Sequence, residues 1–262
     1  MGQEKILVEK RGHVLMMGWN RPEKRNAFDV DMYGAMAAAY GRLHADDDLR
    51  CGLVYAVGGH FTGGLDLEQW APIFARGEYP PLPAGAIEPF GWNEDRRVAK
   101  PVVFAAQGIC YTVGLELMLA CDIRIAASDA RFAQIEVKRG LFPVGGATVR
   151  LMQEIGWGNA MRYLLTGDEI SASEALRMGL VQEVTEPSRQ LDRGLEIAER
   201  VAKQAPLGVQ ASLASARLAR IEGDRVAMAR LIDDLVPVMN SEDAKEGVRS
   251  FMERREARFT GR

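Results

Sequence analysis

Short apolar segments alternate with helical segments along most of the chain, and this alternation most limits the folds it can adopt. Residues 52–57, 102–106 and 123–127 have the length and apolar character of buried strands. Residues 27–43 instead carry apolar side chains at helical spacing, and helical stretches separate the later strands. Strands that are apolar on both faces and alternate with helices predict an α/β fold built on buried parallel strands.

The two ends of the chain follow different patterns. Residues 6–9 and 14–19 predict a β-hairpin with its turn at 10–13. Residues 187–262 show no strand pattern but two apolar stripes at helical spacing, one on Leu191, Leu195, Ala198 and Ala202, the other on Met228, Ile232, Leu235 and Met239. Such stripes pack in a core or an oligomer interface far more often than they bind a cofactor. We therefore expect two parts, a core at 1–186 and a helical subdomain at 187–262.

One internal segment is neither strand nor helix by its composition. Residues 72–95 are rich in proline and glycine, which predicts a long irregular loop. Loops of this length in a compact domain are usually lids or binding loops. We expect this loop to help shape a ligand site.

Composition excludes several classes of function. The 262 residues are 47% hydrophobic and 26% charged, which is typical of a globular protein and not of a disordered one. The formal net charge of −3 gives no basic field that would favour nucleic acid. Three scattered histidines and three cysteines without metal-binding spacing predict no metal site. The N-terminus lacks a signal-peptide core, and no segment predicts a membrane span, so a cytoplasmic location is expected.

Two glutamates stand out as candidates for chemistry. Glu116 lies in an apolar run after a predicted buried strand, where an isolated carboxylate is unfavourable unless it is hydrogen-bonded or protonated. The spacing leaves open whether it is a satisfied core residue or a functional one. Glu136, taken alone, predicts a surface residue paired with Lys138 or Arg139. If the fold brings both acids into one dry cleft, one can act as a base while the other keeps a proton.

Glycines at the ends of predicted strands offer a second signal. Gly63 and Gly64 follow the strand at 52–57, and Gly108 and Gly114 follow the strand at 102–106. Glycine lets a ligand approach backbone N–H groups closely, although ordinary turns explain these glycines equally well. The chain has no GxGxxG, no GxxxxGK[ST] and no GxSxG, so dinucleotide, P-loop and serine-hydrolase functions lack support.

Five ordered stretches together resemble the crotonase, or enoyl-CoA hydratase/isomerase, superfamily. They are Trp19–Phe28 with its NRP…NA pattern, Phe61–Asp66, Lys100–Asp122, Phe132–Gly146, and Leu165–Val181 with LTGD. The resemblance implies a spiral of ββα repeats, a C-terminal helical subdomain that forms a homotrimer or a dimer of trimers, and an acyl-CoA substrate. Coenzyme A is then part of the substrate, and no separate cofactor is expected.

The resemblance also assigns roles to individual residues. The backbone N–H groups of Leu65 and Val113 fall where the family binds the thioester carbonyl. Glu116 and Glu136 fall on the two glutamates of hydratases, which implies water addition to a 2-enoyl-CoA. Positions that contact coenzyme A or the acyl group fall on Arg25, Ala27, Gly63, Asp66, Leu67 and Gly114.

The chain departs from the family pattern at three places. Thr112 and Val113 stand where the family often has glycines, and Ile135 stands where it often has proline. Leu67 and Glu68 replace the basic residues that often follow the first loop, so phosphate contacts would fall to Lys24, Arg25 or the C-terminus. Two alternatives therefore stay open beside a hydratase: a Δ3,Δ2-enoyl-CoA isomerase or another acyl-CoA enzyme of this superfamily, and a non-catalytic acyl-CoA-binding protein.

Overall fold

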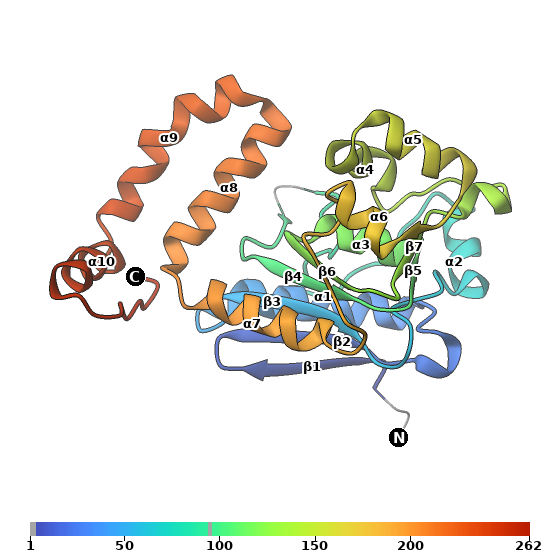
Figure 1. The fold of residues 1–262 in the computed structure, drawn as a ribbon, viewed down its shortest axis with the longest axis horizontal. Coiled ribbons are helices and arrows are strands. Elements are labelled where there is room, and N and C mark those ends of the chain that lie inside the picture. Colours follow the sequence, from blue (N-terminus) through green and yellow to red (C-terminus); the bar gives the residue numbers. More distant parts are fainter. Residues whose placement is uncertain (1–3, 94–95) are drawn as a thin grey trace.

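The computed structural model describes residues 4–93 and 96–262, and within them a six-stranded sheet forms the centre of the molecule (Figure 1). Its order is β1-β2-β3-β4-β6-β9, with bounds Ile6–Arg11, Val14–Trp19, Cys51–Ala56, Val102–Ala106, Ile123–Ala127 and Glu183–Thr185. β1 and β2 form the predicted hairpin, with a turn of only Gly12 and His13, and the other neighbouring strands pair in parallel. The predicted α/β class is confirmed, and β4 and β6 match their predicted bounds.

A second, smaller sheet lies beside the first. It contains β5 (Ile109–Tyr111), β7 (Arg131–Ala133) and β8 (Ile170–Ser171). Sequence analysis missed all three, because strands of two or three residues are too short to show an alternating pattern. They complete a repeat: β4 and β5 precede α3 (Val113–Ala120), and β6 and β7 precede α4 (Ala147–Ile155). This repeated order is the ββα pattern that the family resemblance implies.

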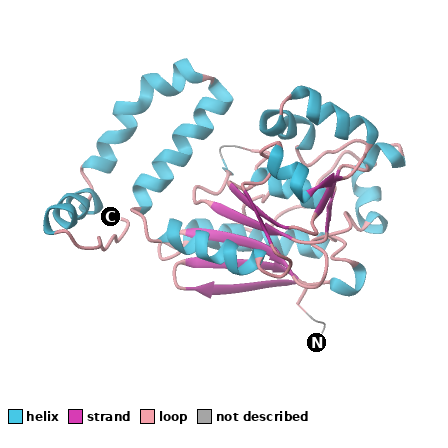
Figure 2. Ribbon diagram, in the orientation of Figure 1, coloured by secondary structure: helices cyan, strands magenta, loops and turns pink. Residues whose placement is uncertain are grey.

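Helices cover the sheet on both faces (Figure 2). Besides α3 and α4, the core contains α1 (Val30–Ala45), α2 (Leu67–Phe74), α5 (Trp157–Thr166), α6 (Ala172–Arg177) and α7 (Gln190–Ala202). α1 begins at residue 30, three residues after its predicted start. The Asp29 side chain caps it by accepting a 2.9 Å hydrogen bond from the backbone N–H of Met32, which fixes the first turn.

α7 belongs to the packing of the core although it lies beyond residue 186. Its predicted stripe faces β3, β4 and β6, where Ala198 and Ala202 join Leu53, Val103 and Ile125 in one apolar cluster. The first helices to leave the core are therefore α8 (Pro206–Glu222), α9 (Asp224–Met239) and α10 (Glu242–Glu253), which extend away from the sheet in Figure 1. The division of the chain at 186/187 into two domains remains a prediction.

The predicted irregular loop at 72–95 is partly helical and well packed. Residues 72–74 form the end of α2, and residues 94 and 95 lie outside the described residues. Between them, Tyr79 packs on Trp92 with ring centroids 4.2 Å apart, and Trp92 stacks on Phe90 at 5.3 Å. These aromatic contacts hold Tyr79 at the rim of the cavity described below.

Candidate active site

A cavity of about 810 Å³ opens between the end of β5, helix α2 and the segment after β7. This volume is within the range of small-molecule sites. Both candidate glutamates line it, together with glycines and apolar side chains. The lining comprises residues 63–65, Leu67, Phe74, 77–79, 112, 113, Glu116, 135, 136, 139–142 and Val144.

Glu116 lies in the first turn of α3 and is almost fully buried, with 4% of its surface exposed. Its Oε1 accepts hydrogen bonds from the backbone N–H groups of Gly145, at 2.6 Å, and Ala147, at 3.2 Å. Burial raises the pKa of Glu116 to about 7, although these two N–H groups and the charge of Arg150 act to lower it. The carboxylate is therefore both desolvated and held in one orientation.

Gly145 is required for that orientation. A Cβ atom at this position would lie 2.5 Å from Oε2 of Glu116 and 2.7 Å from its carboxyl carbon. Such distances are well below van der Waals contact, so any side chain here would displace the carboxylate. Sequence analysis placed Gly145 in a family stretch but did not identify this contact.

Glu136 begins a short 3-10 helix, η3 (Glu136–Arg139), and is half-buried. Desolvation, together with the charge of Glu116, raises the pKa of Glu136 to about 7, although its own backbone N–H acts to lower it. Gln134, in the amide orientation that satisfies its hydrogen bonds, donates to the two Glu136 oxygens at 2.8 and 3.0 Å. Lys138 pairs instead with Asp168 at 3.9 Å. The interpretation of Glu136 as an ordinary surface residue is wrong, because the fold turns it into the cavity.

Leu65 and Val113 line the same cavity from two different segments of the chain. Val113 is the first residue of α3, so its N–H has no partner within the helix. Leu65 forms a parallel bridge with Phe28, in which Phe28 N–H donates to the Gly64 carbonyl and Asp66 N–H donates to the Phe28 carbonyl. That pattern turns the N–H of Leu65 away from Phe28. Two backbone donors thus border the space next to the glutamate pair.

The structure separates the other predicted contact residues into two groups. Gly63 and Leu67 line the cavity. Asp66 instead forms an ion pair with Arg21 at 2.8 Å, which anchors the loop that carries Leu65. Gly114 is packed so closely on Thr62 that a Cβ atom would lie 2.4 Å from its methyl group.

Two more of the predicted coenzyme A contact residues, Arg25 and Ala27, lie outside the cavity wall. Arg25 is exposed and Ala27 is half-buried, both next to η1 (Pro22–Lys24). The Arg25 carbonyl accepts a 2.9 Å hydrogen bond from Gly63 N–H, so this segment is joined to the wall. Their roles in binding coenzyme A remain predictions.

An apolar rim extends the cavity beyond the glutamates. Leu141 and Phe142 are 54% and 66% exposed, and Val144, Phe74 and Tyr79 continue the same surface. Phe74 and Tyr79 belong to the 72–95 segment that was expected to help shape a ligand site. Sequence analysis gave Leu141, Phe142 and Val144 no role of their own, although the consecutive apolar residues after Gly140 are a visible signal. A rim of this composition favours a substrate with an apolar end.

A second cavity, of about 480 Å³, separates α4 from α8 and differs in chemistry. Its walls include Arg217, which pairs with Asp122 at 3.1 Å, and Arg220, which pairs with Glu154 at 2.9 Å. These ion pairs join the projecting helix α8 to the core. Asp122 and Glu154 are each held in an ion pair with an arginine, so this cavity does not offer two carboxyl groups as proton acceptor and proton donor. We therefore assign the candidate active site to the first cavity.

The described residues contain neither a candidate metal site nor a helix that could cross a membrane. In the parts of the chain that the structure describes, no group of three His, Cys, Asp or Glu side chains could hold a metal ion. No helix there is both long and apolar enough to span a membrane. The expected cytoplasmic location stays a prediction.

Comparison with known proteins shows what the chain is similar to. A family model described as enoyl-CoA hydratase/isomerase matches residues 9–262. The enoyl-CoA hydratase EchA19 of Mycobacterium tuberculosis is 37% identical over 98% of this chain and 96% of its own length. The (E)-benzylidenesuccinyl-CoA hydratase of Thauera aromatica is 33% identical over 98% and 99%. A crystal structure of a probable enoyl-CoA hydratase/isomerase from Mycobacterium abscessus superposes with a TM-score of 0.94 at 45% identity, covering 98% and 99% of the two chains.

The raised pKa of Glu136 predicts a pH-dependent effect on stability. An acid with a higher pKa in the folded protein binds more protons when folded, so unfolding becomes easier as pH rises from about 4.5 to about 7. Glu136→Gln removes the ionisable group and with it this loss of stability at higher pH. We expect its Tm to exceed the wild-type Tm by roughly 2–4 °C at pH 8 and to match it at about pH 4.

The measurement is calorimetry or circular dichroism across that pH range. Glu199→Gln, which changes an exposed glutamate on α7, serves as the control and should leave the curve unchanged. A Glu136→Gln variant that is less stable than wild type at pH 8 would contradict the assigned desolvation.

Proposed function

Because the chain belongs to the enoyl-CoA hydratase/isomerase family, we propose that it adds water across the 2,3 double bond of a 2-enoyl-CoA thioester. One observation carries this proposal: two glutamates share one cavity with two backbone N–H donors. A hydratase needs an acid, a base and a means of stabilising negative charge on the thioester oxygen. Coenzyme A enters as part of the substrate, and the reaction needs no further cofactor.

The first step is binding of the thioester carbonyl by Leu65 and Val113. As water adds at C3, electron density moves through C2 to the carbonyl oxygen, which becomes enolate-like. Two fixed N–H donors stabilise that charge, and the N-terminus of α3 adds its dipole at Val113. Backbone donors need no reorganisation when the charge develops.

The surroundings of the two acids favour different proton states. Glu116 accepts two backbone N–H donors, which stabilise its ionised form. Gln134 and the backbone N–H of Glu136 donate to the Glu136 carboxyl group, but desolvation and the negative charge of Glu116 favour its protonated form. Glu116 then takes a proton from water as the oxygen bonds to C3, and Glu136 delivers its proton to C2. The step leaves Glu116 protonated and Glu136 ionised, and transfer of one proton from Glu116 to Glu136 restores the pair. The elements of one water have then been added, and the product is a 3-hydroxyacyl-CoA.

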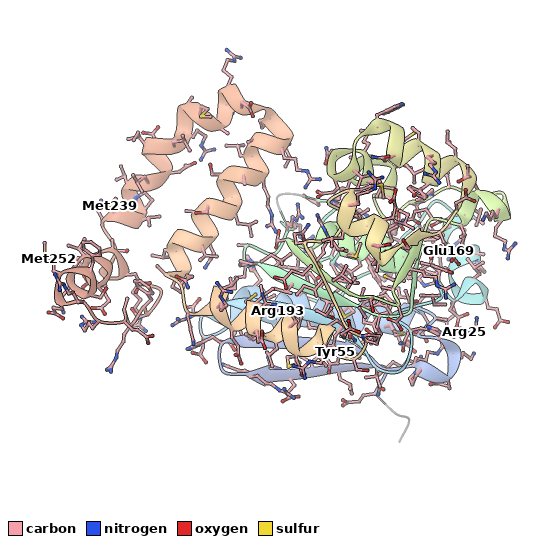
Figure 3. The ribbon with its side chains drawn as sticks, in the orientation of Figure 1. Arg25, Tyr55, Glu169, Arg193, Met239 and Met252 are labelled. Carbon is pink, nitrogen blue, oxygen red and sulfur yellow. The ribbon has the colours of Figure 1, made fainter. Side chains whose placement is uncertain are left out.

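Binding of the coenzyme A portion involves the exposed basic residues near Gly63. Lys24 and Arg25 are both exposed at the end of η1, and Figure 3 labels Arg25 at the edge of the core. The Gly63–Arg25 backbone hydrogen bond connects them to the loop that binds the thioester. Phosphate groups favour such paired positive charges.

Turnover of crotonyl-CoA tests the function directly. We expect loss of the enone absorbance with wild type, and losses of about a hundredfold or more in kcat for Glu116→Gln and Glu136→Gln, because each removes one proton-transfer group. The control is Glu199→Gln on the surface of α7, which should retain full activity.

Product analysis separates the alternatives. A 3-hydroxyacyl-CoA product from 2-enoyl-CoAs supports the hydratase. Conversion of a 3-enoyl-CoA to its 2-enoyl isomer without hydration would instead support the isomerase. Tight binding of acyl-CoA with no turnover of any of these thioesters, in wild type and both variants, would indicate a binding protein.

The proposed reaction needs one of the two glutamates ionised and the other protonated, and this requirement predicts its pH profile. Below the lower pKa of the pair both acids are protonated and no base is present, whereas above the higher pKa both are ionised and no acid is present. Because both glutamates titrate at about 7, we expect kcat/KM to form a bell centred near neutral pH.

The control for this profile is a pantetheine thioester, which lacks the phosphates of coenzyme A. Its profile should show the same bell, since the titrating groups belong to the protein. A flat kcat/KM from about pH 5.5 to about pH 8.5 with both substrates would exclude the glutamate pair as acid and base.

We also propose that α8, α9 and α10 form the interface of a homotrimer or a dimer of trimers. The apolar stripe predicted on α9 is exposed in the single chain, with Met228 at 68% and Ile232 at 71%. Met239 and Met252 likewise lie on the helices that project from the core (Figure 3). An exposed apolar surface of this kind marks a protein interface.

Light scattering should therefore give three or six times the chain mass of 28.9 kDa. Ile232→Glu places a charge on the exposed stripe, and we expect it to reduce the assembled mass, while Glu199→Gln leaves it unchanged. A wild-type mass of one chain at micromolar concentration would overturn this assignment.

A further inference from the structure

Thr112 has a backbone conformation that its side chain does not favour. Its φ is 47° and its ψ is −113°. Four other non-glycine residues have positive φ in the described part of the chain, and two of them, Arg25 and Arg254, have ψ near 40° in the left-handed helical region. Thr112 lies outside that region, and a β-branched residue with this φ is strained.

The Thr112 hydroxyl carries a second local disadvantage. Its Oγ1 is buried, and among the described residues it has no hydrogen-bond partner. Buried hydroxyls in folded proteins are nearly always bonded, since leaving one unpaired is unfavourable. Strain and an unpaired polar atom at one residue are the pattern expected where function requires a side chain that stability does not.

The Thr112 side chain packs directly over Gly64, across the cavity wall. A Cβ atom at Gly64 would lie 2.7 Å from Thr112 Oγ1 and 3.8 Å from its Cβ and Cγ2. Gly64 itself has a φ of 124° and has no side chain of its own to meet Thr112. Thr112 therefore fills the space between two loops that are far apart in the sequence.

Each of these two residues directly precedes a carbonyl-binding donor. Gly64 precedes Leu65, and Thr112 precedes Val113. Thr112 is fixed from behind, because its N–H donates to the Ala133 carbonyl at 2.8 Å and its own carbonyl accepts from Glu116 N–H at 3.0 Å. A shift of Thr112 against Gly64 would change the separation of the two donors.

We infer that Thr112 is a positioning residue that sets the distance between the N–H groups of Leu65 and Val113 through its contact with Gly64. This inference rests on the proposed function for the role of those donors. A glycine at 112 would adopt the same φ without strain but would leave the contact empty. The Thr112 side chain thus lowers the stability of the fold while it fixes the separation of the two N–H donors.

Thr112→Gly tests this inference because it should move stability and activity in opposite directions. We expect a higher Tm, from relief of strain, and a kcat lowered about tenfold or more with a nearly unchanged KM, since small displacements of catalytic groups reduce rate strongly. Thr112→Ser keeps Oγ1 over Gly64 and should restore most of the wild-type kcat. A Thr112→Gly variant with higher Tm and unchanged kcat would overturn the inference.

A second measurement does not depend on turnover. Bound 4-(dimethylamino)cinnamoyl-CoA reports polarisation of its thioester carbonyl as a red shift of its absorbance. We expect a shift with wild type and Thr112→Ser and a smaller shift with Thr112→Gly at similar Kd. Equal shifts in wild type and Thr112→Gly would overturn the inference. The wild type could also give the expected red shift and yet hydrate no enoyl-CoA. That result would overturn the hydratase assignment and leave the positioning role of Thr112 in place.

Discussion

The buried carboxylate of Glu116 is the interaction on which the rest of the site depends. An isolated carboxylate in an apolar helix is unfavourable, and two backbone N–H groups from the 145–147 turn provide the compensation. That turn can approach only because residue 145 is glycine. The contact therefore fixes the orientation of α3 against α4, and with it the position of Val113. It also places a negative charge that adds to desolvation in raising the pKa of Glu136.

Division of labour between backbone and side chains explains why the site tolerates an unusual sequence. In the proposed mechanism, carbonyl binding uses backbone N–H groups, which Leu65 and Val113 supply as well as glycine would. Proton transfer uses carboxylates, which cannot be replaced in this way. The departures at 112, 113 and 135 thus alter packing around the reaction centre and leave its chemical groups intact. This is why a chain that departs from the family pattern at these positions keeps the donors and both acids.

Sequence patterns predicted the parts of the fold that repeat locally. β4 is apolar over its whole length and β6 is apolar except for Arg124, so their bounds could be read directly. β5, β7 and β8 could not, since their pairing depends on residues distant in the chain. Glu116 was a candidate from its apolar neighbours alone. Glu136, with Lys138 and Arg139 close by in the sequence, predicted a surface residue when taken alone, and only the family resemblance paired it with Glu116.

The residues proposed to carry out the reaction and the residues of the apolar rim lie on different kinds of structural element. Both glutamates lie on short helices. Of the two proposed carbonyl donors, Leu65 lies in a β-bridge with Phe28 and Val113 is the first residue of α3. The apolar rim instead comes from α2 and from the loops at 77–79 and 140–144, where Leu141 and Phe142 point side chains into solvent. Loops tolerate sequence change far better than packed helices do. The rim can therefore vary to suit different acyl groups while the acid, the base and the donors stay in place.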